Sequence, residues 1–285
     1  MFEHTLTGIL LALITTLPLA WKWQLGVRRI TLLVVLLALL SGLLVTFLGY
    51  WISINFLLRS GLVWLMTLTM LFAFLAYRFY RDPERTAPER DDVIVSPADG
   101  KVIYVRESRN GMLPVSTKYG HEYPLQELTK MPFYSQEAMV LGISMNFLDV
   151  HVNRVPIAGR IILHRHFPGR FGSLRLPEMV FENERATTVI EQNDLQVAVV
   201  QIASRLVRQI AVFVGEGQDV KLGQRFGVIR FGSQVDLVLP TRQDLKLTVQ
   251  PGDLVKAGQT IIATFKNIDE RIPETQEHFD VQGKR

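Results

Sequence analysis

Three long runs of apolar residues fill the first quarter of the chain, and each is flanked by cations rather than by the turns of a soluble fold. The uncharged runs cover residues 5–21, 30–58 and 60–77. At about 1.5 Å per residue, the middle run spans a hydrocarbon core of about 30 Å comfortably, whereas the first reaches only roughly 25 Å. The pattern predicts a membrane anchor of two or three transmembrane helices over residues 1–78.

The cations at the ends of these runs predict the orientation of the anchor. Arg59 alone separates the second run from the third, whereas the other two junctions hold more cations: Lys22, Arg28, Arg29, Arg78, Arg81 and Arg85. Lys and Arg are retained on the cytoplasmic side of a membrane. We therefore expect both basic ends, and everything after residue 78, in the cytoplasm at the cell (inner) membrane.

Two other interpretations of the apolar runs have less support. The first run could be a cleaved signal peptide, but Pro18 and the Trp-Lys-Trp sequence at 21–23 offer no small-residue cleavage site. A buried helical hairpin in a soluble protein is the other alternative. Aromatic residues near the predicted interfaces favour the membrane instead, namely Trp21, Trp23, Tyr50, Trp51 and Tyr77.

From about Asp91 the pattern changes to short β-branched runs separated by Gly, Pro, Asn and Asp. The clearest runs cover residues 92–96, 101–106, 196–204, 209–214 and 227–231. Near the end, alternating apolar residues at 245, 247 and 249 precede a Pro-Gly-Asp turn and a further run at 260–265. This pattern predicts a mainly β (α+β), sandwich-like domain with few helices over residues 79–285, with a solvated tail after Asn267.

Composition narrows the chemistry. The chain is 48% apolar with a mean hydropathy of +0.19, values typical of a protein that lies partly in lipid. The net charge of +4 is too modest to indicate a nucleic-acid partner. The absence of cysteine excludes disulfides, thiolate metal sites, iron–sulfur clusters and a cysteine nucleophile. Any reaction must therefore rely on other side chains or on a cofactor.

A Gly-Ser pair, Gly232 and Ser233, lies between two strand-like runs. Taken alone, such a pair is typical of a turn or bulge in which glycine supplies an unusual backbone angle. Three motifs precede it in order: Ser-Pro-Ala-Asp-Gly at 96–100, Asp-Val-His-Val-Asn-Arg-Val-Pro at 149–156, and Glu-Asn-Glu-Arg at 182–185. This combination makes the pair a candidate for chemistry.

With Phe-Tyr-Arg-Asp-Pro-Glu-Arg at 79–85, these motifs resemble the phosphatidylserine decarboxylase family, and its shorter bacterial and archaeal branch in particular. The likeness extends from residue 79 to about residue 265. It implies that the Gly232–Ser233 bond cleaves itself and that Ser233 becomes an N-terminal pyruvoyl group. The chain would then become a β chain of residues 1–232 and an α chain that starts at Ser233, and the two would stay associated.

The resemblance implies a carboxy-lyase that converts phosphatidylserine to phosphatidylethanolamine and CO2. The pyruvoyl ketone would form a Schiff base with the substrate amine and accept the electrons left when CO2 departs, so that no external cofactor is required. The partner implied is a membrane phospholipid. Oligomeric state is left open by the sequence, as is the choice between this lipid and a related seryl phospholipid such as archaetidylserine.

The resemblance also implies catalytic roles for Asp99 and His151. Alone, Asp99 would be an Asp-Gly turn and His151 a hydrogen-bonded core histidine. A histidine with an ordinary pKa of about 6.5 is suited to protonate the carbanion left by CO2. Longer family members carry a second histidine three positions later, where this chain has Arg154. The base for self-cleavage therefore stays open between His151 and another residue.

Other polar residues have weaker interpretations. His164 and His166 alternate along a strand-like run and could share a divalent metal, but no third ligand is visible, so no metal site is expected. Four arginines could meet the phosphate of a lipid head group: Arg154, Arg165, Arg170 and Arg175.

Two other classes of function remain as alternatives. Residues 251–265 look like half of a lipoyl- or biotin-carrier module, but Lys256 lacks the usual neighbouring Met or Asp. A zinc peptidase would instead use His164 and His166, and metal analysis would separate it from a pyruvoyl enzyme.

Overall fold

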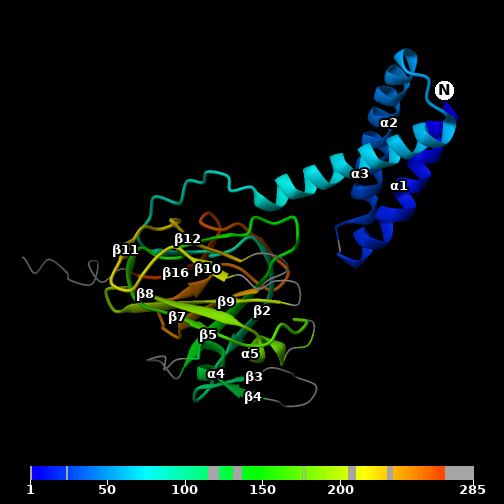
Figure 1. Cartoon of the computed structure of the whole chain (residues 1–285). Helices are drawn as coiled ribbons and strands as arrows, with labels where there is room; N and C mark the ends of the chain where they lie inside the picture. The colour runs from blue at the N-terminus through cyan, green and yellow to red at the C-terminus, as the bar shows by residue number, and fades with distance from the viewer. Residues whose placement is uncertain are drawn as a thin grey trace, which may run out of the picture.

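The computed structural model describes residues 2–23, 25–114, 122–130, 137–174, 176, 178–204, 210–229 and 234–266. Within this part, three helices precede a β-rich unit (Figure 1). They are α1 (Phe2–Lys22), α2 (Val27–Trp51) and α3 (Phe56–Tyr80), and each is long and apolar enough to cross a membrane. The structure thus favours three spans over two.

The boundaries of the helices differ from those of the apolar runs. Helix α1 has 21 residues, which gives a length of about 32 Å and removes the apparent shortfall of the first run. The predicted run 30–58 is divided, because α2 ends at Trp51 and the Asn55 side chain accepts a 2.9 Å hydrogen bond from the Leu58 amide as the N-cap of α3. Arg59 therefore lies inside α3, where its guanidinium donates to the carbonyl of Ile54.

Small residues let the three helices approach closely. A Cβ added at Gly8 would lie 2.4 Å from the Val63 side chain, and one added at Gly42 would lie 2.5 Å from Thr5. Inside the bundle the Thr67 hydroxyl donates to Ser41 across α3 and α2 at 3.3 Å. Close contact between small residues and interhelical hydrogen bonds are the interactions that hold helices together in lipid.

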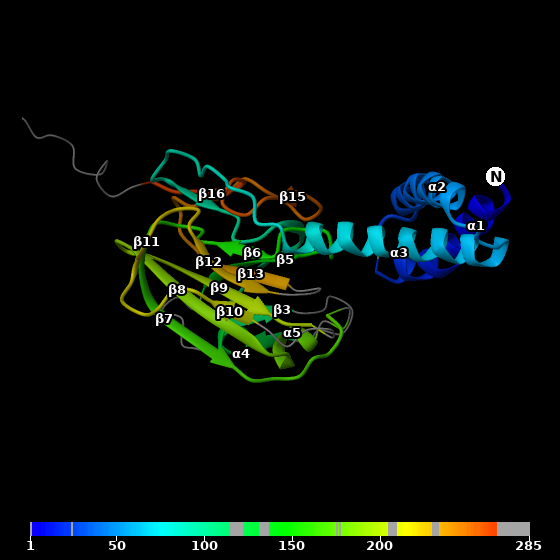
Figure 2. The same ribbon diagram turned by 45° about the horizontal axis from the view of Figure 1, so that its top comes forward.

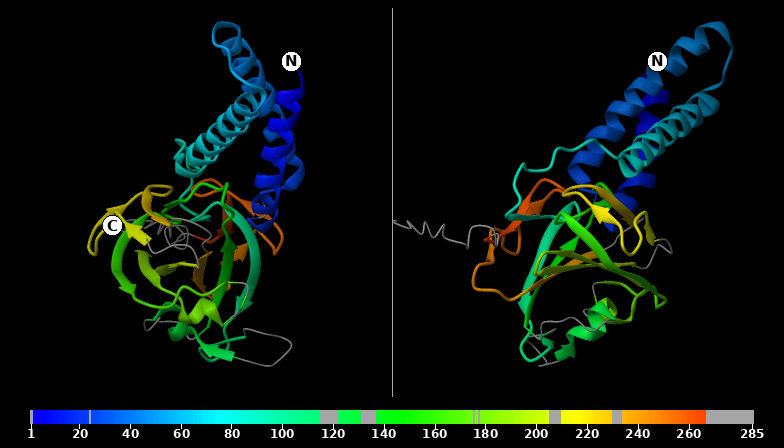
Figure 3. Two further views of the ribbon diagram at one scale, coloured as in Figure 1. Left: turned by 45° about the vertical axis from the view of Figure 1, so that its right-hand side comes forward. Right: turned by 90° about the vertical axis from the view of Figure 1, so that its left-hand side faces the viewer.

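The β-rich unit is built on one curled antiparallel sheet of eight strands, ordered β11-β7-β8-β9-β13-β5-β2-β15 (Figure 3). Its strands are β2 (Gly100–Glu107), β5 (Ala138–Ser144), β7 (Gly159–Phe167), β8 (Arg185–Gln192), β9 (Leu195–Ile202), β11 (Asp219–Val220), β13 (Gln234–Pro240) and β15 (Leu254–Val255). The expectation of a mainly β domain after the helices is confirmed.

Shorter elements cover the two faces of the sheet. One face is covered by β1 (Val93–Val95), β16 (Ile261–Thr264) and β14 (Lys246–Leu247), and by β10 (Ile210–Val212), β12 (Arg225–Ile229) and β6 (Val152–Arg154). The other face is covered by the hairpin β3 (Met112–Pro114) and β4 (Glu122–Pro124) with two short helices, α4 (Leu125–Thr129) and α5 (Met179–Glu182).

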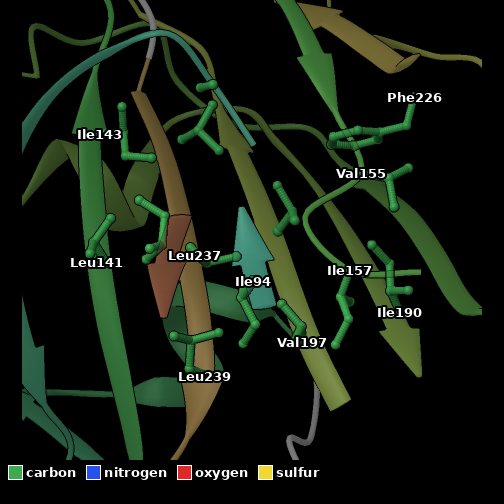
Figure 4. Close-up of a cluster of buried hydrophobic side chains, with 14 of the residues drawn as sticks. Ile94, Leu141, Ile143, Val155, Ile157, Ile190, Val197, Phe226, Leu237 and Leu239 are labelled. Carbon is green, nitrogen blue, oxygen red and sulfur yellow. The ribbon is translucent and has the colours of Figure 1, made fainter. Parts of the chain in front are cut away.

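Each face has its own hydrophobic core, because side chains alternate along the strands. On β13, Leu237 and Leu239 enter the first core, where Figure 4 shows them beside Ile94 and Ile143. Val238 points to the second core, which includes Leu128 of α4. The central strands are therefore buried on both sides, which leaves the loops at the sheet ends as the places for chemistry.

One end of the sheet faces the membrane helices (Figure 2). Gln234, at the start of β13, pairs with Ser144 at the end of β5 and with Ile202 at the end of β9. The loop after β5 carries Phe147 and Leu148, which pack on the apolar cluster at the base of the helices. Gln234, the residue after Ser233, therefore starts its strand at the membrane-facing end of the sheet.

Candidate functional site

The predicted cleavage residues Gly232 and Ser233 lie outside the described residues, but both flanks of the segment are described. On one side, the Ile229 amide donates a 3.1 Å hydrogen bond to the carbonyl of His151. On the other side, Gln234 is buried and paired between β5 and β9. The described chain thus stops at Ile229, beside His151, and resumes at Gln234 at the centre of the sheet.

His151 is buried in an apolar setting. Its side chain belongs to a residue that is only 2% exposed, and neither ring nitrogen has a hydrogen-bond partner within the described part of the chain. Burial lowers its pKa to about 4, an effect that the Asp149 backbone opposes, Arg81 strengthens and Asp99 opposes. The imidazole is therefore neutral at pH 7 and ready to accept a proton. To act as a proton donor it must first take one up.

Asp99 is held in a fixed position by an ion pair. Both of its carboxylate oxygens accept hydrogen bonds from the Arg85 guanidinium, at 2.5 and 2.8 Å, and one also accepts from the amide of Ala257 at 2.8 Å. Bidentate contacts of this kind fix orientation as well as charge. No hydrogen bond joins Asp99 to His151 among the described residues, so the two side chains are not directly linked in this structure.

Arg154 is committed to contacts within the protein. One guanidinium nitrogen donates to the carbonyl of Gly223 at 3.0 Å, and the other donates to the carbonyl of Pro83 at 2.9 Å and lies 3.4 Å from Asp82. Arg225 also pairs with Asp82. Arg154 is only 4% exposed and ties the segment after α3 to the β-rich unit. These contacts, rather than a lipid phosphate, occupy both terminal nitrogens, whereas Nε is buried without a hydrogen-bond partner among the described residues.

The remaining histidines and arginines are spread over separate contacts. His164 bonds to Thr188 at 3.0 Å and His166 bonds to Glu184 at 2.9 Å. In the described ranges, no three His, Asp or Glu side chains are grouped as metal ligands. Arg170 pairs with Glu182 on the surface, and Arg175 lies outside the described residues.

A buried polar network adjoins the cleavage segment and was not predicted from the sequence. The Gln234 amide donates to the Tyr104 hydroxyl at 2.7 Å and to Asp236 at 2.6 Å, and the Tyr104 hydroxyl donates to Asp236 at 2.7 Å. Burial raises the pKa of Asp236 to about 6. A Gln and an Asp at alternate positions in an otherwise apolar strand are the sequence feature that could have indicated it.

An open cavity of about 490 Å³ lies beside the same end of the sheet. It is lined by residues of β7, α4, α5 and β8, among them Phe167, Lys130, Phe181 and Arg185. Arg185 is almost fully buried, and its guanidinium donates to the carbonyls of Glu127 and Leu128. Burial lowers its pKa to about 10, so it remains charged at neutral pH. The cavity is therefore lined by a mixture of apolar and charged residues, with Glu127 and Glu182 beside the cations Lys130, Arg170 and Arg185.

Comparison with known proteins identifies relatives over the β-rich unit. The family model described as phosphatidylserine decarboxylase matches residues 72–263. A putative archaetidylserine decarboxylase proenzyme of Methanocaldococcus jannaschii is 40% identical over 193 residues, which is 68% of this chain and 90% of that protein. A phosphatidylserine decarboxylase proenzyme of Syntrophus aciditrophicus is 36% identical over 203 residues, 71% of this chain and 85% of its own length.

Proposed function

Since the chain belongs to the phosphatidylserine decarboxylase family, and is thus a carboxy-lyase, we propose that it decarboxylates the serine head group of a membrane phospholipid with a pyruvoyl group formed from its own Ser233. The observation that carries the proposal is the hydrogen bond from Ile229 to His151. It ties the start of the segment that contains Gly232 and Ser233 to a buried histidine with unpartnered ring nitrogens.

Self-processing needs a serine hydroxyl, a base and water. The Ser233 oxygen attacks the Gly232 carbonyl and replaces the amide with an ester. Loss of the Ser233 Cα proton then expels the Gly232 carboxylate, and hydrolysis of the resulting dehydroalanine releases ammonia and leaves the ketone. His151 suits the role of base, because its low pKa keeps it unprotonated at pH 7. Asp99, held by Arg85, supports this step by orienting the loop around it.

The residues near the segment fit a pyruvoyl group, which supplies the electron sink for loss of CO2. The orphaned ring nitrogens of His151 form a buried acid–base site with no competing partner in the described chain. Entry of a carboxylate and a phosphate beside the imidazole raises its pKa, because nearby anions favour the charged form. His151 can then take up the proton that it returns to the carbon from which CO2 has left.

The substrate class follows from the three apolar helices and from the relatives. The names of the relatives differ in the lipid backbone, phosphatidylserine in one and archaetidylserine in the other, but both carry a serine head group. A seryl phospholipid with ether-linked chains is the second candidate, favoured by the 40% identity to the archaeal relative. Side-by-side turnover of the two lipids in the same vesicles distinguishes them.

We also propose that the β-rich unit, from about residue 79 onward, faces the cytoplasm at the cell (inner) membrane. The basic ends of the helices support this orientation: Lys22 and Arg28 flank the turn between α1 and α2, Arg78 lies in the last turn of α3, and the cluster at these ends packs with Phe147 and Leu148 of the β-rich unit. A reporter fused after Arg285 that is active only outside the cytoplasm tests it, and activity of that reporter would contradict the orientation.

The decisive experiment is an intact mass of the purified protein. We expect two chains, residues 1–232 and 233–285, with the second lacking a free N-terminal amine and trapping substrate upon borohydride reduction. Ser233→Ala should remain one chain without decarboxylase activity, whereas Ser173→Ala, in the loop before α5, should process and turn over normally. A single uncut chain with full wild-type activity would refute the pyruvoyl mechanism.

A further inference from the structure

A row of three aromatic rings connects the membrane helices to His151. The ring of His151 lies 4.3 Å, centroid to centroid, from Phe79 at the end of α3. Phe79 lies 5.0 Å from Phe147, and Phe147 stacks on Trp23 at 5.7 Å with an interplanar angle of 14°. Trp23 belongs to the turn between α1 and α2. The rings thus join the turn between α1 and α2, and the C-terminal end of α3, to the candidate catalytic histidine.

The row is part of a packed apolar contact. Phe79 is only 3% exposed, and Phe147 and Leu148 pack against the cluster of buried residues at the base of the helices. The turn that holds Phe147 is closed on itself, since the Asn146 amide donates to the Asp149 side chain at 2.7 Å. His151 follows two residues later. The helices therefore pack against the segment that leads into His151.

A buried catalytic histidine is usually oriented by a hydrogen bond from one ring nitrogen to a carboxylate or a carbonyl. In the described part of the chain neither ring nitrogen of His151 meets a partner in good hydrogen-bond geometry, although the Asp149 backbone lies close enough to raise the pKa of the imidazole, and Asp99 is engaged by Arg85. Packing against Phe79 is therefore a main contact that sets the plane of the imidazole. The same contact excludes water, which keeps the imidazole neutral.

We infer that the membrane anchor positions the catalytic imidazole: Phe79 contacts His151 directly, and Trp23 acts on it through Phe147. The inference rests on the proposed function, in which His151 moves the proton. The family match begins at residue 72, so Phe79 lies within the matched region, whereas Trp23 and the first two helices lie before it. In this chain the first two helices thus add to catalysis as well as to tethering.

The test uses the full-length, fully processed protein in vesicles that contain a seryl phospholipid. Phe79→Leu removes the ring but keeps an apolar side chain, and Phe72→Leu is its control on the exposed, 75% accessible side of α3. Trp23→Ala is matched by Trp51→Ala at the far end of the bundle, where the indole is 73% exposed. Trp23→Phe restores a ring at the first position.

We expect Phe79→Leu and Trp23→Ala to lower kcat by about tenfold or more with KM within about twofold, since misplacement of a catalytic group acts on the chemical step. The apparent pKa that His151 contributes to the pH profile of kcat should rise toward about 6.5 as water enters. The other groups that act on the imidazole, namely the Asp149 backbone and the charges of Arg81 and Asp99, are unchanged in all variants. Trp23→Phe and both controls should behave like the parent.

Two results would overturn the inference. If Phe79→Leu and Trp23→Ala match their controls in kcat and pH profile while His151→Ala has lost turnover, the proposed function stands and the positioning role is wrong. If His151→Ala turns over lipid like the parent, the catalytic assignment fails and the inference fails with it. If Phe79→Leu does not fold, the comparison of Trp23→Ala with Trp23→Phe tests the inference instead. This comparison is suitable because Trp23 lies outside the β-rich unit.

Discussion

The hydroxyl of Tyr104 reaches across an entire strand to donate a 2.7 Å hydrogen bond to the Asp236 carboxylate. Tyr104 lies on β2 and Asp236 on β13, and Gly142 of the intervening β5 is in register with both. A Cβ on Gly142 would lie 2.4 Å from the tyrosine ring. Glycine at this position therefore lets the ring cross β5 and close the polar network beside the cleavage segment.

The network predicts that Gly142→Ala and Tyr104→Phe both slow self-processing. Gly142→Ala displaces the ring, and Tyr104→Phe removes one hydrogen-bond partner from both Asp236 and Gln234, which still bond to each other, at a cost of about 1–3 kcal/mol in the free energy of unfolding. Processing is followed by the appearance of the 233–285 chain over time, and stability by thermal melting. Tyr77→Phe, at an exposed site on α3, is the control. Parent-like rates in both variants would contradict the prediction.

Asp236 predicts a pH-dependent contribution to stability. Its pKa is raised from 3.8 to about 6 by burial, so between these values the folded state binds more protons than the unfolded state. Asp236 therefore increases the free energy of unfolding as the pH falls from about 6 toward 3.8, by up to about 3 kcal/mol. Asp236→Asn should remove this gain.

The buried His151 acts with the opposite sign, because its pKa is lowered to about 4 and stability from this group is lost as pH falls from 6.5 toward 4. The measurement is consequently the difference in melting temperature between parent and Asp236→Asn from pH 7.5 to 5. A difference that stays constant over this range would show that Asp236 does not titrate as the structure indicates.

Arg85→Ala should impair processing as much as Asp99→Ala does, because each change removes the same buried ion pair and leaves one charge without its partner. Breaking such a pair from one side costs about 3–5 kcal/mol. Uncut chain should accumulate in both variants on denaturing gels. Arg90→Ala, which breaks the exposed pair with Asp92, should process normally. Rapid, complete cleavage in Arg85→Ala would contradict the proposed role of the Asp99 ion pair in self-processing.

Arg154→His should not accelerate processing. The arginine reaches the carbonyls of Gly223 and Pro83 at once, and an imidazole is too short to replace both contacts. We expect a loss of about 1–3 kcal/mol in the free energy of unfolding from the unpaired carbonyls. Arg165→His, on strand β7, serves as the control. Faster cleavage in Arg154→His would instead mean that this position can host a second catalytic histidine, as in the longer relatives.

The sequence by itself determined the broad organisation of this protein. Long uncharged apolar runs can only be stable in lipid or fully buried, so they identified the anchor, and β-branched runs separated by turns identified the mainly β unit that follows. Strands 92–96 and 196–204 were found because they are short, apolar and bounded by turn residues, whereas β5, β7 and β8 were not among the clearest runs. The Gly232–Ser233 assignment came from the order of motifs, which is a property of the sequence alone.

Only the tertiary structure decided which residues meet. Hydrophobic periodicity reports which side of an element is apolar, but it carries no information about which element packs on that side. The contacts of His151 with Phe79, of Asp99 with Arg85, and of Tyr104 with Asp236 each depend on how separate segments are brought together. Sheet order placed Tyr104 and Asp236, 132 residues apart, on either side of Gly142, and the docking of the helices placed the Phe79 ring 4.3 Å, centroid to centroid, from the ring of His151.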